Sequence, residues 1–323
     1  MTETDDRKPR EPEPLWVVTG PTAAGKSALA LALAERLDLE ILSMDSMALY
    51  RGMDIGTAKP TAADRARVPH HLVDLVEPHE SFDTARWCEA AAQALAEVTA
   101  RGRRALFVGG TPLYLMAFFK GMVAGPAADP ALRAELEARE TAAPGSLHAE
   151  LARSDPAAAA RIHPKDRRRL VRALEFHHLT GEPISSRQDH FEADGWQRPC
   201  RIVAVQRARD DLHGRVRART EAMLDAGLLD ETARIEAASG FSRTAGSAIG
   251  YAECRDFLRG RYKDREELRN RIRRSTHRLI RRQTTWLRRL AEVAWLDPAA
   301  GCDGLLRALA TADATPGNPR SHR

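Results

Sequence analysis

The feature that most constrains this chain is a short apolar run that ends in a glycine-rich loop closing on Lys-Ser. Residues 15–27 read LWVVTGPTAAGKS, so an expected buried strand leads into the full pattern G-x-x-x-x-G-K-[ST]. An Ala- and Leu-rich helical run follows, which is the context that this pattern requires. The sequence therefore predicts a phosphate-binding loop at the start of an α/β domain, without saying whose phosphates it binds.

Each part of the loop has a mechanical role in holding phosphate. Glycines allow backbone N–H groups to turn toward a polyphosphate, Lys26 neutralises its charge, and the Ser27 hydroxyl can coordinate Mg²⁺. The helix that begins near Ser27 adds its positive N-terminal dipole. A chance glycine-rich turn is the alternative, and the match at all four fixed positions disfavours it. The predicted phosphate-binding residues are Gly20, Pro21, Thr22, Ala23, Ala24, Gly25, Lys26 and Ser27, and Ser27 is also the predicted metal ligand.

The length of 323 residues is sufficient for an α/β core and a smaller module. No apolar run approaches the roughly 20 residues of a membrane span, and residues 1–14 are polar and Pro-rich, unlike a signal peptide. We expect this N-terminal stretch to be a disordered tail. The four cysteines are scattered without metal-binding spacing, which favours a reducing, cytoplasmic location.

Strand and helix patterns alternate over residues 15–128 and predict the first part of a parallel-sheet core. Because the carboxyl ends of parallel strands share one edge of the sheet, residues that follow the strands should meet the phosphate loop. Asp45 and Thr111 each follow an apolar run. Asp45 is explained equally well as a helix cap or as a carboxylate beside the phosphates, and Thr111 as a helix cap or a phosphate contact. The expected strands cover 15–19, 39–44, 71–76, 104–110, 200–206 and 293–297, and the expected core helices 27–38, 83–101 and 112–120.

Two patterns refine the function of the crevice above the loop. Residues 49–60 contain glycines and no clear period, so we expect a loop over the crevice with Lys59 as an anion contact. P-loop enzymes that hydrolyse nucleotides usually carry a magnesium-binding Asp at the end of an apolar strand, whereas the run 104–110 ends in glycine. This disfavours an ATPase motor or a switch.

The composition changes to Ala, Arg, Glu and His with helical periodicity over residues 129–198, which predicts an inserted helical module. The core then resumes over residues 199–323. Within the module, Arg167 to Arg169 and Arg172 lie next to Leu170 and Val171. Such a run is typical of a solvated helix face, and a contact with the phosphates of a nucleic acid is the other interpretation.

The last long helix, expected at residues 264–290, carries ten arginines in a chain of net charge +5. So much arginine exceeds what packing requires, and it predicts a basic surface for a nucleic acid, with some arginines pairing with acidic neighbours.

Several stretches taken together resemble one family, the tRNA dimethylallyltransferases (tRNA isopentenyltransferases). The most specific are the Asp-Ser pair followed by YRGMDIGTAKP, and RRQTTWLRR near the C-terminus. The matching blocks are GPTAAGKS (20–27), ILSMDSMALYRGMDIGTAKP (41–60), PHHLVDLV (69–76), FVGGTPLYLMAFFKG (107–121), DPAAAARIHPKDRRRLVRALE (155–175), AIGYAE (248–253) and RRQTTWLRR (281–289). The resemblance covers nearly the whole chain after the tail.

The resemblance implies a P-loop parallel-sheet core with an inserted helical domain. It also implies transfer of the dimethylallyl group from dimethylallyl diphosphate to N6 of the adenosine on the 3′ side of the anticodon, in tRNAs that read codons beginning with U. The enzyme would be a cytoplasmic monomer that uses Mg²⁺ and no membrane. Asp45 would take the proton from N6, while Lys26, Thr111 and Arg219 would hold the diphosphate.

The resemblance further implies which residues contact the tRNA anticodon stem-loop. They are Asp45, Ser46, Met47, Ala48, Thr111, Arg133, Arg168, Arg169, Leu170, Val171, Arg172, Ser247, Ala248, Ile249, Gly250, Tyr251 and Ala252. Two positions depart from the family pattern, which often has Gln in place of Ala48 and Arg or Lys in place of His277.

Three other functions share parts of this sequence. A P-loop small-molecule kinase would account for residues 20–45 but not for the arginine-rich module and last helix. A second alternative is an RNA-binding protein without catalysis that uses the P-loop as a structural or regulatory site. A prenyltransferase acting on free adenine nucleotides would share the core, and the large basic insertion disfavours it.

Overall fold

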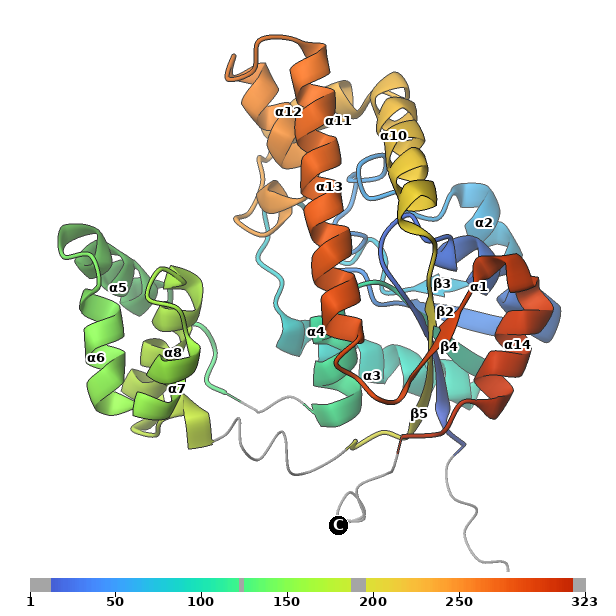
Figure 1. The fold of residues 1–323 in the computed structure, drawn as a ribbon, viewed down its shortest axis with the longest axis horizontal. Coiled ribbons are helices and arrows are strands. Elements are labelled where there is room, and N and C mark those ends of the chain that lie inside the picture. Colours follow the sequence, from blue (N-terminus) through green and yellow to red (C-terminus); the bar gives the residue numbers. More distant parts are fainter. Residues whose placement is uncertain (1–12, 122–124, 187–195, 316–323) are drawn as a thin grey trace, which may run out of the picture. The chain divides into compact units, whose positions relative to one another are not determined.

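The structure is a computed structural model that describes residues 13–121, 125–186 and 196–315. Contacts divide the chain into two compact units (Figure 1). The first comprises the chain up to Phe119 together with the stretch that begins at Arg198, and the second runs from Lys120 to Gln197. The predicted tail at residues 1–14 falls almost entirely outside the described residues. Within the described residues, no helix is long and apolar enough to cross a membrane.

The first unit is built on a six-stranded sheet in which every strand pair is parallel. Its order is β3-β2-β4-β1-β5-β6. The strands are β1 (Leu15–Thr19), β2 (Leu39–Ser43), β3 (His70–His71), β4 (Arg104–Val108), β5 (Cys200–Val205) and β6 (Val293–Leu296). The predicted α/β class with a parallel sheet is therefore confirmed, and β1, which leads into the glycine loop, occupies a central position.

Helices cover both faces of this sheet, as a buried parallel sheet requires. On one face, Leu33 of α1 (Lys26–Leu37) and Leu305 of α14 (Gly301–Thr311) pack with Leu106 and Val203 in one apolar cluster. On the other face α3 (Thr84–Ala100) and α4 (Pro112–Leu115), which continues as a π-helix over Met116–Gly121, build an aromatic cluster. There the rings of Trp87 and Tyr114 stack with centroids 4.2 Å apart.

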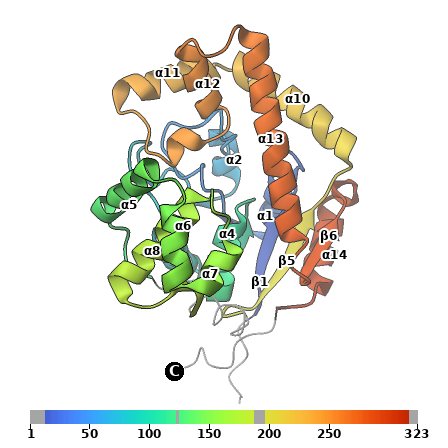
Figure 2. The ribbon, with the colours of Figure 1, turned by 60° about the vertical axis from the view of Figure 1, so that its left-hand side comes forward.

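Four further helices follow β5 along the chain. They are α10 (Arg209–Asp225), α11 (Leu228–Ala238), α12 (Tyr251–Leu258) and α13 (Arg265–Leu287). Helices α10 and α13 lie side by side (Figure 2). The apolar side of α13 includes Leu268, Ile272, Ile280 and Leu287. Arg269 and Arg273 pair with Glu221 of α10, and other arginines of α13 line the clefts described below.

The predicted strand at residues 71–76 is wrong over most of its length. Only His70–His71 pairs with β2, and Val76 forms an isolated bridge with Tyr50. The backbone turns left-handed at Leu72 and Asp74, with φ of 64° and 57°, which ends the strand. A short helix that the sequence did not predict, α2 (Ala62–Arg67), lies just before it.

An ion-pair cluster explains this turn and corrects the expected role of Lys59. The Lys59 ammonium group lies 2.6 Å from an oxygen of each of Asp54, Asp74 and the Tyr50 carbonyl. Arg65 also donates to Asp74, at 2.7 Å. All three donors of Lys59 are thus used within the protein, so it is not the anion contact that the sequence suggested.

The second unit is helical. Its described helices are α5 (Pro130–Ala142), α6 (Ser146–Ser154), α7 (Pro156–Arg161) and α8 (Arg167–Thr180). An aspartate cap starts three of them, with Asp129, Asp155 and Asp166 each accepting a hydrogen bond from a backbone N–H of the first turn. Leucines such as Leu136, Leu151 and Leu170 form the core of this unit.

A buried carboxylate joins α8 to α5 in this unit. The Glu175 side chain has no exposed surface, and it accepts hydrogen bonds from Arg133 (2.7 and 2.8 Å) and from Arg172 (2.7 Å). The Asp129 N–H also donates to it, at 2.8 Å. Burial by itself would raise the pKa of Glu175, but the hydrogen bonds from the two arginines outweigh it and hold the pKa below its ordinary value.

Replacing Glu175 with Gln should destabilise the helical unit by about 2 to 3 kcal/mol, because two arginines lose their shared carboxylate. The cost is limited because both guanidinium groups already reach solvent. Since the folded-state pKa is lowered, the stabilisation is present at neutral pH and disappears as the pH falls through that pKa. Hydrogen exchange of α5 and α8 in the full chain should be faster in Glu175→Gln at pH 7 and should converge with wild type in acid.

Glu135→Gln, at an exposed position on α5, is the matched control and should exchange as wild type does. Equal protection of α8 in wild type and Glu175→Gln at neutral pH would contradict the role of this carboxylate.

Candidate functional site

The glycine loop connects β1 to α1 in the conformation that its pattern predicts. Gly20 has φ of 132°, and a Cβ at this position would lie 2.5 Å from the Val205 carbonyl oxygen of β5. No residue with a side chain fits there without moving the neighbouring strand. Gly25, with φ of 96°, precedes the first turn of α1, so the unpaired N–H groups of that turn face the loop.

Lys26 carries the positive charge of the loop. Its ammonium group lies 3.5 Å from the Pro21 carbonyl oxygen and has no ion pair with a carboxylate of the described residues. Burial lowers the pKa of Lys26 to about 8, the nearby Asp45 carboxylate raises it, and Arg219 lowers it. Two cations and one carboxylate therefore share this space, an arrangement that an anionic ligand would stabilise.

Asp45 directly follows Met44 at the end of β2, as predicted. Its Oδ1 accepts hydrogen bonds from the N–H groups of Met47 (2.8 Å) and Ala48 (3.4 Å). Its Oδ2 accepts no hydrogen bond from the described residues. One oxygen of Asp45 thus orders the turn, in agreement with the capping interpretation, and the other remains available as an acceptor.

Thr111 lies opposite, beyond the end of β4. Its side chain does not cap the helix that follows, which excludes the helix-cap interpretation for this hydroxyl. Instead its Oγ1 accepts a hydrogen bond from the Ser46 N–H at 3.1 Å. This bond joins the turn that carries Asp45 to the edge of β4.

Arg219 reaches the loop from α10, although it lies almost two hundred residues away in the sequence. Its Nη1 donates to the Thr22 hydroxyl at 3.4 Å. Burial lowers the pKa of Arg219, and Asp45 raises it. Arg219 thus places a second cation beside Lys26.

All four predicted catalytic residues line one cavity of about 480 Å³. Asp45, Thr111, Lys26 and Arg219 supply its polar wall, and Trp286 belongs to its apolar wall. The other apolar side chains are Met47, Pro112, Leu113, Val216, Met223, Ala248, Ile249, Ile272 and Leu279. An adjoining cavity of about 310 Å³ contacts Lys26, Asp45 and Arg219 again and adds Ser27 and Ala48. The site therefore combines an anion-binding end with an apolar wall and one carboxylate.

The residues expected at the tRNA contact in this unit separate into two groups. Ser46, Met47, Ser247, Ala248 and Ile249 line the main cavity. Gly250, Tyr251 and Ala252 line neither of the two cavities.

The Tyr251 side chain is fully buried, where its hydroxyl donates to Glu231 and accepts from the Gly56 N–H at 3.1 Å. A side-chain contact between Tyr251 and RNA is therefore ruled out, and this residue instead supports the loop at 49–60.

The helical unit also requires a correction. Leu170 and Val171 are buried in its core, at 0% and 4% exposure, so their side chains present no surface to RNA. Arg133 and Arg172 are bound to Glu175, as described above. Arg168 and Arg169 are exposed.

Sequence reasoning missed the residue that closes the site, Gln283 of α13. Its Oε1 accepts from the Thr22 N–H at 2.9 Å, and its Nε2 donates to the Gly110 carbonyl oxygen at 2.6 Å. A Cβ at Gly110 would lie 2.6 Å from that Nε2, which explains the glycine. The available signal was an amide at an apolar position of α13, three residues after Ile280 and four before Leu287.

Comparisons with known proteins identify the family of this chain. Residues 48–290 match the family model described as IPP transferase. A tRNA dimethylallyltransferase of Anaeromyxobacter dehalogenans is 47% identical over 296 residues, which cover 91% of this chain and 98% of that protein. The chain belongs to the IPP transferase family.

Other IPP transferase relatives match over similar lengths. A tRNA dimethylallyltransferase of Methylococcus capsulatus is 45% identical over 297 residues, which cover 90% of this chain and 94% of that protein. The crystal structure of the full-length tRNA isopentenylpyrophosphate transferase of Bacillus halodurans has a TM-score of 0.64 and 39% identity, covering 88% of this chain and 90% of that one. The match to the family model spans the helical unit and much of the unit that contains the sheet.

Replacing Gln283 with Leu should weaken the binding of inorganic diphosphate about tenfold, because the Thr22 N–H and the Gly110 carbonyl lose their buried partner and the loop is no longer fixed. Isothermal titration with diphosphate measures this directly. Gln283→Glu should lose at least as much affinity, because its carboxylate would face the Gly110 carbonyl oxygen and would add a negative charge beside the diphosphate.

Asn270→Leu is the matched control, since the Asn270 amide hydrogen-bonds only Glu266 within α13. Diphosphate affinity that is the same in folded Gln283→Leu and wild type would show that the loop does not depend on this amide.

Proposed function

We propose that this enzyme transfers the dimethylallyl group from dimethylallyl diphosphate to N6 of the adenosine on the 3′ side of the anticodon, in tRNAs that read codons beginning with U. The product is N6-(dimethylallyl)adenosine. The observation that carries the proposal is the single cavity in which a phosphate loop, an apolar wall and one carboxylate with a free oxygen meet. The names of the relatives described above supply the tRNA and the dimethylallyl group.

The chemistry requires each of these three parts. An exocyclic adenine amine is a poor nucleophile and must lose a proton, so a base is needed beside it. The allylic C1 becomes electrophilic as diphosphate leaves, so an anion site is needed on its other side. The five-carbon chain between them is apolar, which matches side chains such as Met223, Leu279 and Trp286.

The reaction proceeds as a substitution at C1. A bond forms between N6 and C1 while the bond from C1 to the diphosphate oxygen breaks. The proton of N6 passes to Asp45 Oδ2, and the diphosphate leaves toward Lys26, Arg219 and the N–H groups at the start of α1. Thr111 holds the turn of Asp45 in place through its hydrogen bond with Ser46. These groups stabilise negative charge that grows in the transition state, so they accelerate the reaction and do not only bind the donor.

The donor atoms present fit Mg²⁺. Ser27 lines the adjoining cavity of about 310 Å³, and its hydroxyl has no hydrogen-bond partner among the described residues. Oxygen is the ligand atom that Mg²⁺ prefers. Within the described residues no three His, Cys, Asp or Glu side chains form a metal cluster, so oxygens of the diphosphate and water would complete the shell. When bound, Mg²⁺ neutralises charge on the leaving diphosphate.

The acceptor must reach the cavity as an unstacked base. Adenosine next to the anticodon is stacked in the loop, so it has to be flipped out at a cost of a few kcal/mol, about what contacts with neighbouring nucleotides can recover. We assign part of these contacts to Ser247, Ala248 and Ile249 at the cavity, and others to the exposed Arg168 and Arg169 of the helical unit. The enzyme would act as a monomer on tRNA in the cytoplasm.

Replacing Asp45 with Asn should lower kcat by a factor of about 10² to 10⁴, because the amide oxygen can still order the turn but the amide cannot take a proton from N6. Single-turnover assays with saturating donor and an anticodon stem-loop measure the chemical step. Asp230→Asn, at an exposed position of α11 that lines neither cavity of the site, is the control and should retain wild-type turnover. Unchanged single-turnover rates in Asp45→Asn would remove this residue from the reaction.

The proposed function itself is tested by incubating the enzyme with dimethylallyl diphosphate, Mg²⁺ and an anticodon stem-loop that carries three consecutive adenosines. Mass analysis of the RNA should show one added dimethylallyl group at a single adenosine. A parallel reaction with ATP and small alcohols should give no phosphoryl transfer. Unmodified RNA together with steady phosphoryl transfer would support a small-molecule kinase instead.

A further inference from the structure

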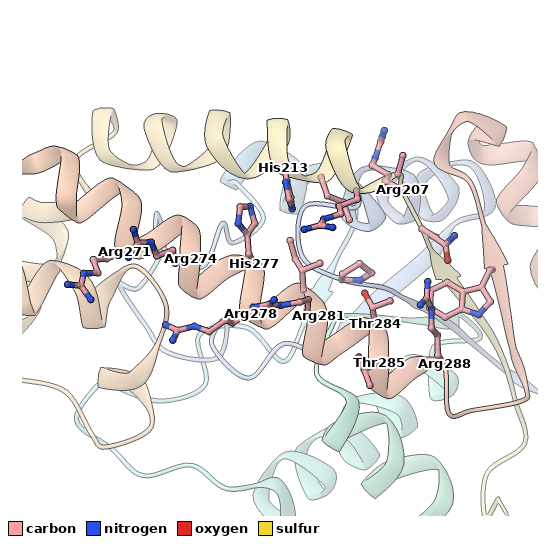
Figure 3. A pocket seen from close by; sticks show the side chains of 17 residues that line it. Arg207, His213, Arg271, Arg274, His277, Arg278, Arg281, Thr284, Thr285 and Arg288 are labelled. Atoms are coloured by element: carbon pink, nitrogen blue, oxygen red, sulfur yellow. The ribbon is translucent and has the colours of Figure 1, made fainter.

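A second cavity, of about 1000 Å³, lies on another face of α13, between this helix and the start of α10 (Figure 3). We call it the α10–α13 groove and define its charged lining by Arg207, Arg209, Arg271, Arg274, Arg278, Arg281 and Arg288. It shares no lining residue with the catalytic cavity, which contacts Thr276, Leu279, Gln283 and Trp286 of the same helix. The groove is therefore a separate feature of the surface.

The charge of this groove is strongly one-sided. Arg271, Arg274, Arg278, Arg281 and Arg288 follow one another along α13 mostly in steps of three or four residues, so they share one face. Figure 3 shows these arginines in a row along the helix, with His213 of α10 facing His277. From the first to the last arginine the row extends about 26 Å at a rise of ~1.5 Å per residue. Among the residues that the structure describes, no aspartate or glutamate lines this cavity.

Most of these arginines are available to a ligand. Arg207 pairs with Asp211, and Arg271 pairs with Glu267. Within the described residues, by contrast, no carboxylate lies at ion-pair distance from the other five, which are Arg209, Arg274, Arg278, Arg281 and Arg288. Folding leaves at least five guanidinium groups in one groove without a counter-charge, which is costly unless an anion binds there.

The groove also contains an aromatic surface. Trp295 of β6 lines it and keeps 36% of its surface exposed, although it is one of the largest apolar side chains. In the middle of the groove, the ring centroids of His213 and His277 lie 4.3 Å apart. A cationic groove with an exposed aromatic ring is the combination that proteins use for single-stranded nucleic acid, where phosphates contact cations and a base stacks on the ring.

A basic path connects the groove to the catalytic cavity. A third cavity, lined by Ser247, Ile249, Glu253, Ser275, Arg278, Arg281 and Arg282, lies between them. Its three arginines outnumber the one carboxylate, Glu253, which accepts a hydrogen bond from the Gly250 N–H. Arg278 and Arg281 also line the groove, and Ser247, Ile249 and Arg282 also line the catalytic cavity. A polymer with one nucleotide in the catalytic cavity can thus continue across α13, whereas a small free anion would use neither the path nor the length of the row.

We propose that the α10–α13 groove binds the sugar–phosphate backbone of RNA that flanks the modified adenosine, with Trp295 stacking on one unpaired base. The proposal rests on the proposed function for the identity of the RNA as substrate. It assigns a role to arginines that face away from the catalytic cavity and to the exposed indole.

The test replaces three groove arginines together, as Arg209→Gln, Arg274→Gln and Arg288→Gln, in the full chain. The matched control removes the same charge from exposed arginines that line none of the cavities, as Arg217→Gln, Arg265→Gln and Arg307→Gln. Both proteins are titrated with the anticodon stem-loop over a series of salt concentrations. The groove variant should bind at least tenfold more weakly than the control at moderate salt, and its log–log salt slope should be smaller by about 2.

Trp295 gives an independent readout. Trp295→Leu should weaken stem-loop binding about tenfold without changing the salt slope, and Trp295→Phe should restore most of the affinity, because a ring still offers a stacking face. The affinity for inorganic diphosphate should remain at the wild-type value in every groove variant.

Stem-loop affinity and salt slope that are equal in the groove variant and the control would overturn the proposal. It would equally be overturned if the groove variant lost binding of ATP or inorganic phosphate while RNA binding stayed intact, since the groove would then be a small-anion site. If the wild type bound the stem-loop through the groove but added no dimethylallyl group, the proposed function would fail and the RNA site would stand.

Discussion

The buried side-chain amide of Gln283 connects the parts of the site through two hydrogen bonds, of which it accepts one and donates the other. Gln283 joins the Thr22 N–H of the phosphate loop to the Gly110 carbonyl beyond β4, and thus fixes the loop against the strand edge that carries Thr111. Thr111 in turn holds the turn of Asp45 through Ser46. The anion-binding end of the cavity and the carboxylate are therefore positioned by a single chain of contacts that starts on α13.

Different faces of α13 line the catalytic cavity and the α10–α13 groove. One face contributes Leu279, Gln283 and Trp286 to the catalytic cavity, where apolar contact and an ordered loop are needed. Another face carries the arginines of the α10–α13 groove, where charge is needed. Because both faces belong to one helix, RNA bound in the groove as proposed would be held in register with the loop that is proposed to hold the donor. This explains why an arginine-rich helix also contains a buried glutamine.

Much of the fold could be predicted from the sequence because its signals are local. The glycine loop has one geometry that suits its pattern, and parallel strands place the residues after their ends on one edge, so Asp45 and Thr111 were expected beside the loop. The short β3 could not be predicted, because the left-handed turns at Leu72 and Asp74 accompany ion pairs with Lys59 and Arg65 that form only in the folded chain.

Charge patterns were the weakest guide to the site. The arginine run of α8 suggested a surface, but the neighbouring Leu170 and Val171 are core residues and Arg172 neutralises the buried Glu175. Nothing in the local sequence distinguishes an arginine that pairs with a carboxylate of the protein from one that is free to bind an anionic ligand. Gln283 was missed for the related reason that its partners lie 173 and 261 residues away.

The central claim is that the exocyclic amine of one adenosine attacks the donor within this cavity. The most direct measurement replaces the target adenosine of the stem-loop with purine riboside, which lacks that amine but keeps the rest of the base. The account predicts that this RNA binds nearly as well as the parent, receives no dimethylallyl group and causes no release of diphosphate beyond the level without RNA. Transfer of the dimethylallyl group to the amine-free stem-loop would contradict it.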